Sequence, residues 1–194
     1  MILPIYGYGE PVLRKVADDI TPDYPNLSEL IANMFDTMYN AYGLGLAAPQ
    51  IGLPIRMFVI DTEPLSDSED LTPEEVERYI NFKQVFINAK MLKEEGEEWA
   101  FNEGCLSIPE VREDVYRPEQ ITIEYCDENF VKKTEVFNGL IARVIQHEYD
   151  HIEGVLFTDK IALLKKTLIK KKLKNIMEGK FRPDYRMKLA NLRK

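Results

Sequence analysis

Residues 138–154 read NGLIARVIQHEYDHIEG, and this stretch decides the fold. Its apolar side chains recur at helical spacing, at Leu140, Ile141, Val144, Ile145 and Ile152. Asn138 is a residue type that caps helix N-termini, and Gly154 stands where a helix-ending glycine belongs. The pattern predicts an amphipathic helix with one face in the core.

The same stretch contains the pattern HExxH, formed by His147, Glu148 and His151. On a helix, residues four apart lie on one face about one turn apart, so both imidazoles can bind one divalent cation. They are the only two histidines in 194 residues. A catalytic tetrahedral cation takes three protein ligands and keeps its fourth position for water or substrate. The third ligand must therefore come from another part of the chain.

Cys105 is the best candidate for that third ligand. Glu153 lies too close to His151 in the sequence, and a thiolate suits a borderline-soft cation. Residues 102–109, NEGCLSIP, contain a glycine and a proline, which predicts a tight loop around Cys105. Cys126 lies in a predicted strand, where a lone cysteine is most often a small buried apolar residue.

Other segments complete the predicted fold. Apolar residues from Leu27 to Met38 follow helical spacing behind Asn26, a candidate N-cap, and predict a helix that ends near Ala41. Three glycines and a proline in residues 43–52 predict an irregular loop. Short β-branched and aromatic runs predict strands at residues 56–61, 84–88 and 120–126. The expected fold class is α+β, with mixed or antiparallel sheets packed around a central helix that carries HExxH, plus a C-terminal helix.

Two charged segments stand apart from this body. Residues 63–79 are acidic and contain a capping box, Thr72 to Glu75, which predicts a surface insertion with a short helix. Residues 160–194 hold 13 Lys and Arg against 2 acidic residues, whereas residues 1–159 hold 12 against 31. A broad apolar stripe predicts a helix in this basic extension, through Leu164, Leu168, Ile169, Leu173 and Ile176. The extension either contacts nucleic acid or another acidic surface, or is solvated or folded back onto the acidic body.

The composition, 45% hydrophobic and 30% charged, is that of a globular protein, and the length suits one domain over residues 1–194. Two cysteines imply no disulfide framework and suit a reducing compartment. The first residues lack the basic region and cleavage site of a signal peptide, and no apolar run approaches the roughly 20 residues that cross a membrane. We therefore expect a cytoplasmic protein without membrane contact.

Three motifs resemble those of peptide deformylases, in that family's order: GLGLAAPQ at residues 43–50, EGCLS at residues 103–107 and HEYDH at residues 147–151. The resemblance runs from the first predicted helix to about Asp159 and leaves the acidic insertion and the basic extension unexplained. It implies a hydrolase that removes the N-formyl group from N-formylmethionine of nascent polypeptides. It also implies one divalent metal ion per chain, Fe(II) on the family's pattern, with Zn, Ni or Co able to occupy the site.

The resemblance further implies roles for single residues. The metal ligands would be Cys105, His147 and His151. Glu148 would be the general acid and base, acting on a metal-bound water, because the leaving amine must gain a proton before the C–N bond breaks. Gln50 and the backbone amide of Leu106 would stabilise the oxyanion. The alternative for Gln50 is an exposed loop amide.

The formyl group is small, so specificity has to come from the methionine side chain and the peptide backbone. The candidates for an apolar pocket are Leu44, Phe101, Leu140 and Val144, each of which is equally well explained as plain core. The resemblance also implies that the backbone of Gly45, and more weakly Arg112, contact the substrate. Glu103 and Arg117 would form a structural pair that braces the loop.

Two other functions stay open at this point. HExxH is also found in metallopeptidases, which would cleave an internal peptide bond. A closed four-ligand site without a water would instead favour a binding module with a structural cation. The basic extension further predicts docking on ribosomal RNA near the nascent-chain exit.

Overall fold

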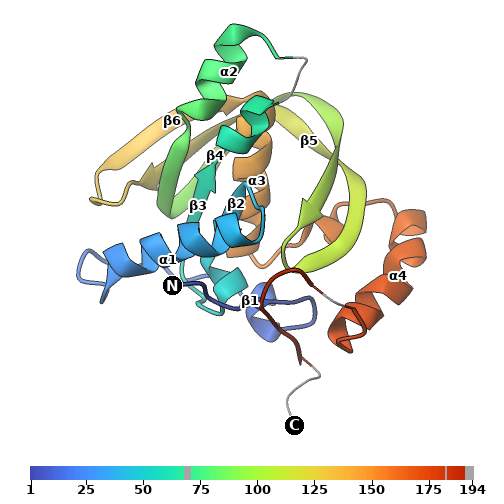
Figure 1. Ribbon diagram of the computed structural model, residues 1–194. Helices are drawn as coiled ribbons and strands as arrows, with labels where there is room; N and C mark the ends of the chain where they lie inside the picture. Colours follow the sequence, from blue (N-terminus) through green and yellow to red (C-terminus); the bar gives the residue numbers. More distant parts are fainter. Residues whose placement is uncertain (68–70, 182, 191–194) are drawn as a thin grey trace.

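The computed structural model describes residues 1–67, 71–181 and 183–190 (Figure 1). Within these ranges the main sheet has five antiparallel strands in the order β2-β3-β4-β5-β6. They are β2 Gly45–Ala47, β3 Met57–Asp61, β4 Lys83–Cys105, β5 Ile108–Cys126 and β6 Lys132–Asn138. Two short strands near the chain ends, β1 Ile5–Tyr6 and β7 Met187–Lys188, pair in parallel. The α+β class is confirmed, and of the two predicted arrangements, mixed or antiparallel, the main sheet is antiparallel.

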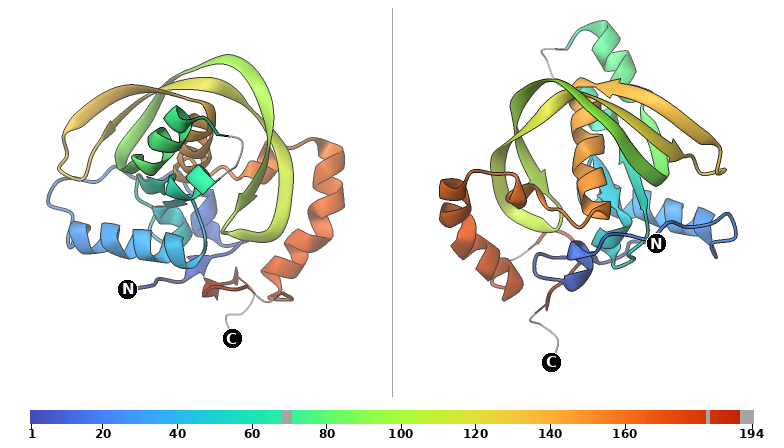
Figure 2. Two further views of the ribbon diagram at one scale, coloured as in Figure 1. Left: turned by 45° about the horizontal axis from the view of Figure 1, so that its top comes forward. Right: turned by 180° about the vertical axis from the view of Figure 1, so that it is seen from behind.

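The β4–β5 hairpin is much longer than the strands predicted at residues 84–88 and 120–126. The middle of β4 is polar and exposed, so no apolar alternation marks it in the sequence, and pairing with β5 supplies its backbone hydrogen bonds. Several register shifts interrupt the pairing, and Figures 1 and 2 show the hairpin curving around the helix α3. The tight loop predicted at residues 102–109 was wrong: Cys105 ends β4, Ile108 begins β5, and only Leu106 and Ser107 form the turn.

The described residues form the α-helices α1 Leu27–Asn40, α2 Pro73–Ile80, α3 Gly139–Ile152 and α4 Leu163–Met177. Helix α3, which carries HExxH, ends at Ile152, and Gly154 occupies the predicted C′ position with a φ of +71°. The amides of Gly154 and Val155 donate to the carbonyls of His151 and Asp150, at 3.2 and 2.9 Å, in a Schellman motif. Asn138 precedes α3 without a side-chain cap hydrogen bond.

Helix α1 also ends where predicted, with Ala41 as its C-cap. Asn26 precedes it, but its side chain makes no cap hydrogen bond because the residue adopts a left-handed conformation, with φ 55°, and not the usual extended one. Residues 43–52 are more regular than the predicted irregular loop, since they contain β2 and a 3-10 helix, Ala48–Ile51. Further 3-10 helices are Pro11–Arg14, Glu63–Asp67 and Phe157–Asp159.

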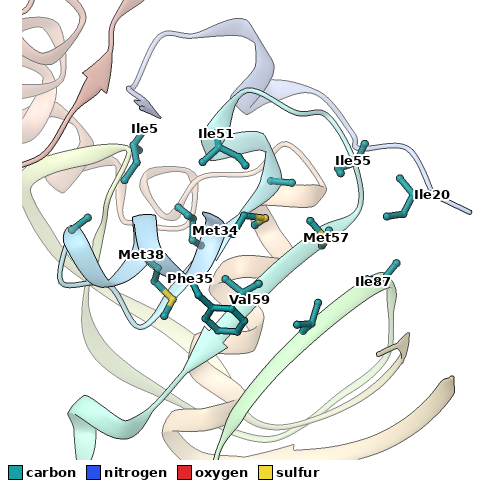
Figure 3. Packing of buried hydrophobic residues seen from close by; sticks show 14 residues of the cluster. Ile5, Ile20, Met34, Phe35, Met38, Ile51, Ile55, Met57, Val59 and Ile87 are labelled. Atoms are coloured by element: carbon teal, nitrogen blue, oxygen red, sulfur yellow. The ribbon is translucent and has the colours of Figure 1, made fainter. Parts of the chain in front are cut away.

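The centre of the sheet is covered on both faces, by α1 on one side and α3 on the other. All of β3 is buried: Met57 and Val59 belong to the cluster around α1, whereas Phe58 and Ile60 belong to the cluster around α3. Successive strand residues point to opposite faces, which explains this division. Figure 3 shows the first cluster, with α1 against β3: Met34, Phe35, Met38, Met57 and Val59. The second cluster anchors α3 and so fixes the place of HExxH.

The acidic segment forms a 3-10 helix and α2, and its residues 68–70 lie outside the described residues. The predicted capping box is confirmed. The amide of Glu75 donates to the Thr72 hydroxyl at 3.3 Å, and the amide of Thr72 donates to the Glu75 carboxylate at 2.9 Å. Most of α2 is exposed, but Tyr79 is buried and holds the insertion against the body.

The C-terminal helix α4 is confirmed, but its broad apolar stripe is only partly buried. Ile169 and Ile176 join a third core cluster, while Leu164 and Leu168 are 73% and 67% exposed, because only one narrow side of α4 meets the body. Lys165 forms an ion pair with Glu113 on β5, at 3.0 Å. Residues 182 and 191–194 of the predicted basic extension lie outside the described residues, and a single domain over residues 1–194 stays a prediction. Within the described ranges, no helix has the length and apolarity that crossing a membrane requires.

Candidate active site

The structure brings Cys105, His147 and His151 together from two elements. Cys105 is the last residue of β4, and both histidines lie on the inner side of α3. Their sulfur and nitrogen ligand atoms all lie within 4.8 Å of one another. The Cys105 Sγ atom is 3.3 Å from His151 Nε2, close to the separation of about 3.6 Å expected of a sulfur and a nitrogen ligand on one tetrahedral cation. This is a group that can hold one divalent, borderline-soft cation.

Glu103 holds His147 from the side away from Cys105. Its carboxylate accepts a hydrogen bond from His147 Nδ1 at 3.0 Å, which leaves Nε2 of that ring to act as the ligand atom. Arg117 donates to both Glu103 oxygens, at 2.7 and 2.9 Å, and to Asp150 at 2.7 Å. Burial alone would raise the pKa of Glu103, but the hydrogen bonds from His147 and Arg117 hold it well below its usual range. A permanently ionised Glu103 therefore orients the imidazole.

The sequence predicted the Glu103–Arg117 pair as a brace, but it did not predict the size of the network. Arg143 donates to Glu103 at 3.2 Å and to the Val115 carbonyl at 3.0 Å. Asp150 also binds Lys160, at 3.2 Å. The available signal was the position of Arg143 four residues before His147, which places both on one face of α3.

Glu148 lies against Gly45 of β2. The carboxylate is 4% exposed, its Oε2 atom has no hydrogen-bond partner within the described residues, and burial raises its pKa to about 7. A Cβ atom on Gly45 would lie 2.5 Å from Glu148 Oε1, so the absent side chain is what makes room for the carboxylate. A carboxyl group poised near neutrality can both accept and return a proton.

Gln50 is fixed by two hydrogen bonds and is not the exposed loop amide of the alternative prediction. Its Oε1 atom accepts from the Ala47 amide at 2.8 Å, and its Nε2 atom donates to Ser107 Oγ at 3.2 Å. Nε2 also lies 3.6 Å from the Cys105 sulfur. The 3-10 helix Ala48–Ile51 and the end of β4 thus aim this N–H group at the metal-binding group.

A cavity of about 700 Å³ opens beside these residues. Its lining includes Leu44, Gly45, Phe101, Arg112 and Val144 among the predicted substrate contacts. Leu140 is not in the lining; it is partly buried and packs against the cluster between α3 and the sheet, so its contact with the substrate stays a prediction. The sequence did not predict that Tyr42, Glu110 and Lys172 also line the cavity.

The family model for polypeptide deformylases matches residues 2–167. The chain belongs to the polypeptide deformylase family. As a deformylase-family member it is an enzyme, a hydrolase, so the binding module with a purely structural cation is set aside. Among the described residues the metal-binding group has three ligands and not four, which agrees with an open, catalytic site.

Known deformylases match over nearly the whole chain. The peptide deformylase of Flavobacterium johnsoniae is 74% identical over 194 residues, covering 100% of this chain and 99% of that protein. The acidic insertion and the basic extension therefore fall within the aligned length. The peptide deformylase of Cytophaga hutchinsonii is 52% identical and covers 97% of both chains.

Solved deformylase structures share the fold. A crystal structure of a peptide deformylase from Legionella pneumophila has a TM-score of 0.77 at 34% identity, covering 93% of this chain and 98% of that one. The Synechococcus elongatus peptide deformylase in complex with actinonin has a TM-score of 0.74 at 39% identity, covering 88% and 85%.

Proposed function

We propose that this deformylase-family enzyme hydrolyses the formyl amide of N-formylmethionyl peptides, releasing formate and a free N-terminal amine. The observation that carries the proposal is the placement of Glu148 beside a Cys–His–His group at the wall of a cavity. The cavity has room for a methionine side chain and a short piece of peptide. The substrate is a nascent polypeptide, and the site of action is the cytoplasm, for which two free cysteines are suitable.

Cys105, His147 and His151 would hold one divalent metal ion, with Fe(II) as the native ion and Zn, Ni or Co able to replace it. The donor set of one sulfur and two nitrogens fits these ions, as does the partner-free space around Glu148 Oε2. When bound, such an ion supplies Lewis-acid activation of water and of the formamide. The remaining chemistry falls to the chain's own residues.

Glu148 is the proposed proton carrier. The carboxylate takes a proton from the attacking water and then delivers it to the leaving nitrogen, because the amine must be protonated before the C–N bond breaks. Burial favours its protonated form, so the second transfer follows readily from the first. Gly45 leaves the room that the carboxylate occupies.

Gln50 Nε2 and the Leu106 amide are the proposed donors to the oxyanion. Both are neutral groups, and Gln50 is oriented by its bonds to Ala47 and Ser107 before substrate arrives. Preorganised donors of this kind stabilise the transition state by about 3–4 kcal/mol each. Leu44, Phe101 and Val144, which line the cavity, and Leu140 are the proposed apolar contacts of the methionine side chain, with the Gly45 backbone and Arg112 along the peptide.

Formate release from a formyl-Met dipeptide by anaerobically purified protein tests the proposal. Glu148→Ala should abolish turnover and retain the metal. A longer unformylated peptide serves as the substrate control, since a metallopeptidase would cleave its internal bonds. Cleavage of that control, or no formate from metal-loaded protein, contradicts the proposed function.

The exposed basic face of α4 supports a second proposal, docking on ribosomal RNA. Lys170 and Lys171 are exposed, and phosphate contacts by lysines weaken steeply with salt. K170E/K171E should reduce cosedimentation with ribosomes and lower the salt slope by roughly 2. The exposed pair Lys90 and Lys93 on β4 gives the matched control K90E/K93E. Equal binding by both variants contradicts the proposal.

A further inference from the structure

The turn Leu106–Ser107 lies at the proposed active site. It directly follows the metal ligand Cys105, and the amide of Leu106 is the proposed oxyanion donor. Cys105 pairs with Ile108 across the hairpin, so two residues make the whole connection. A peptide plane joins the carbonyl of one residue to the N–H of the next, so the Leu106 carbonyl shares its plane with the Ser107 amide and is linked to the Leu106 N–H through the Leu106 Cα. In a turn this short, whatever holds the Leu106 carbonyl therefore restricts the backbone dihedrals of Leu106 and with them the direction of its N–H.

The N-terminal segment holds the second carbonyl of the turn. The amide of Tyr8 donates to the Ser107 carbonyl at 2.8 Å. Ser107 is fully buried, and its hydroxyl accepts the bond from Gln50. This half of the turn is tied to the body from two directions.

The C-terminal segment holds the first carbonyl. The Tyr185 hydroxyl donates to the Leu106 carbonyl at 2.6 Å, and the side chains of both residues pack against the cluster around α1. The contact joins residues 79 positions apart in the chain. Tyr185 is not among the residues that line the cavity, so we infer that it acts through the turn and not by contact with the substrate.

The segment around Tyr185 is itself anchored. The Ile5 amide donates to the Arg186 carbonyl at 2.9 Å, and the Gly7 amide donates to the Lys188 carbonyl at 2.8 Å. Leu189 is buried against Gly7, where a Cβ atom would lie 2.5 Å from the leucine side chain. These contacts fix the position of the Tyr185 backbone relative to the turn. Tyr185 and its neighbours Arg186, Lys188 and Leu189 lie beyond residue 167, where the match to the family model ends.

We propose that Tyr185 is a positioning residue of the active site: its hydroxyl holds the Leu106 carbonyl and thereby sets the backbone conformation of Leu106, the residue that follows the metal ligand Cys105 and carries the proposed oxyanion N–H. The inference rests on the proposed function, because it assigns a task to the C-terminal segment in that same reaction. The segment after α4 is then a part of the catalytic apparatus and not only a basic extension.

Tyr185→Phe tests the proposal, since it removes one oxygen atom and keeps the ring that packs in the core. The matched control is Tyr125→Phe, a buried tyrosine of β5 whose hydroxyl donates to Glu135 and accepts from Gln84, away from the cavity. For each variant we would measure kcat and KM for a formyl-Met dipeptide and the thermal midpoint. The thiolate-to-Co(II) absorption band of the Co(II)-loaded protein is the third readout, because it reports the geometry at Cys105.

Tyr185→Phe should lower kcat roughly three- to tenfold, as expected for one lost neutral hydrogen bond, with KM changed less than about twofold. It should also shift or broaden the Co(II) band. Tyr125→Phe should lower the thermal midpoint and leave kcat and the band unchanged. An unaltered kcat and band in Tyr185→Phe, or equal losses in both variants, overturns the inference. If the unsubstituted protein releases no formate, the proposed function fails, and the Co(II) band alone then decides whether Tyr185 positions the turn.

Discussion

Gly45→Ala should disable the enzyme without removing its metal. The backbone of Gly45 is in an ordinary strand conformation, so alanine meets no conformational strain there. The obstacle is space: the new methyl group would lie 2.5 Å from Glu148 Oε1, 2.6 Å from its Cγ and 2.7 Å from its Cδ. Ordinary contact begins near 3.4 Å, so the carboxylate has to move by about 0.9 Å.

A displacement of that size at the proton carrier should cost about 100-fold in kcat, equivalent to roughly 2.7 kcal/mol of activation free energy. Metal content should stay at one ion per chain, because the three atoms nearest to the added methyl group all belong to Glu148 and not to a ligand. The assay is formate release from a formyl-Met dipeptide, with metal analysis of the same preparation. Full metal content together with a kcat within about threefold of the unsubstituted enzyme would refute the assignment of Glu148 and Gly45.

Gly139→Ala is the control for lost stability. No atom lies within 4 Å of its added Cβ, but its φ of +61° makes alanine unfavourable by about 1–2 kcal/mol. This variant should therefore unfold at a lower temperature and keep its kcat. A parallel loss of kcat in both variants would show that the Gly45 effect comes from a general weakening of the fold.

Further substitutions test the other parts of the site. Cys105→Ala should lose the metal and the activity, whereas Cys126→Ala should keep both; metal retained in the first variant would remove the sulfur from the ligand set. Gln50→Ala should lower kcat by roughly 10²- to 10³-fold with metal content unchanged, and a change confined to KM would argue against an oxyanion donor. Glu103→Gln should weaken metal affinity by about 10- to 100-fold in a chelator competition, since it removes the charge that orients His147; equal affinity would contradict that role. In metal-free protein, burial raises the pKa of Glu148 from 4.5 to about 7. The protonated carboxyl group therefore contributes its full stabilisation below pH 4.5, and this stabilisation is lost as the pH rises through 7. Glu148→Gln should remove this loss, on the order of 3 kcal/mol, and superimposable curves of unfolding free energy against pH would disprove the shift.

The sequence by itself determined the features that depend on local pattern. Helix α3 follows from apolar residues at helical spacing and a terminal Gly154, and once it is helical His147 and His151 must share a face. Cys105 followed from the need for a third ligand, and the structure places its sulfur beside His151. These inferences required only the residues themselves and their spacing.

Tertiary structure alone decided the features that depend on distant partners. The polar middle of β4 is a strand because β5 pairs with it, and Tyr42, Glu110 and Lys172 line one cavity although they come from separate segments. Likewise, the contact of Tyr185 with Leu106 joins segments whose local sequence does not show that they meet. The physical reason is that pairing, burial and long-range hydrogen bonds are properties of two segments together, and a pattern within one segment specifies neither the identity nor the position of the other.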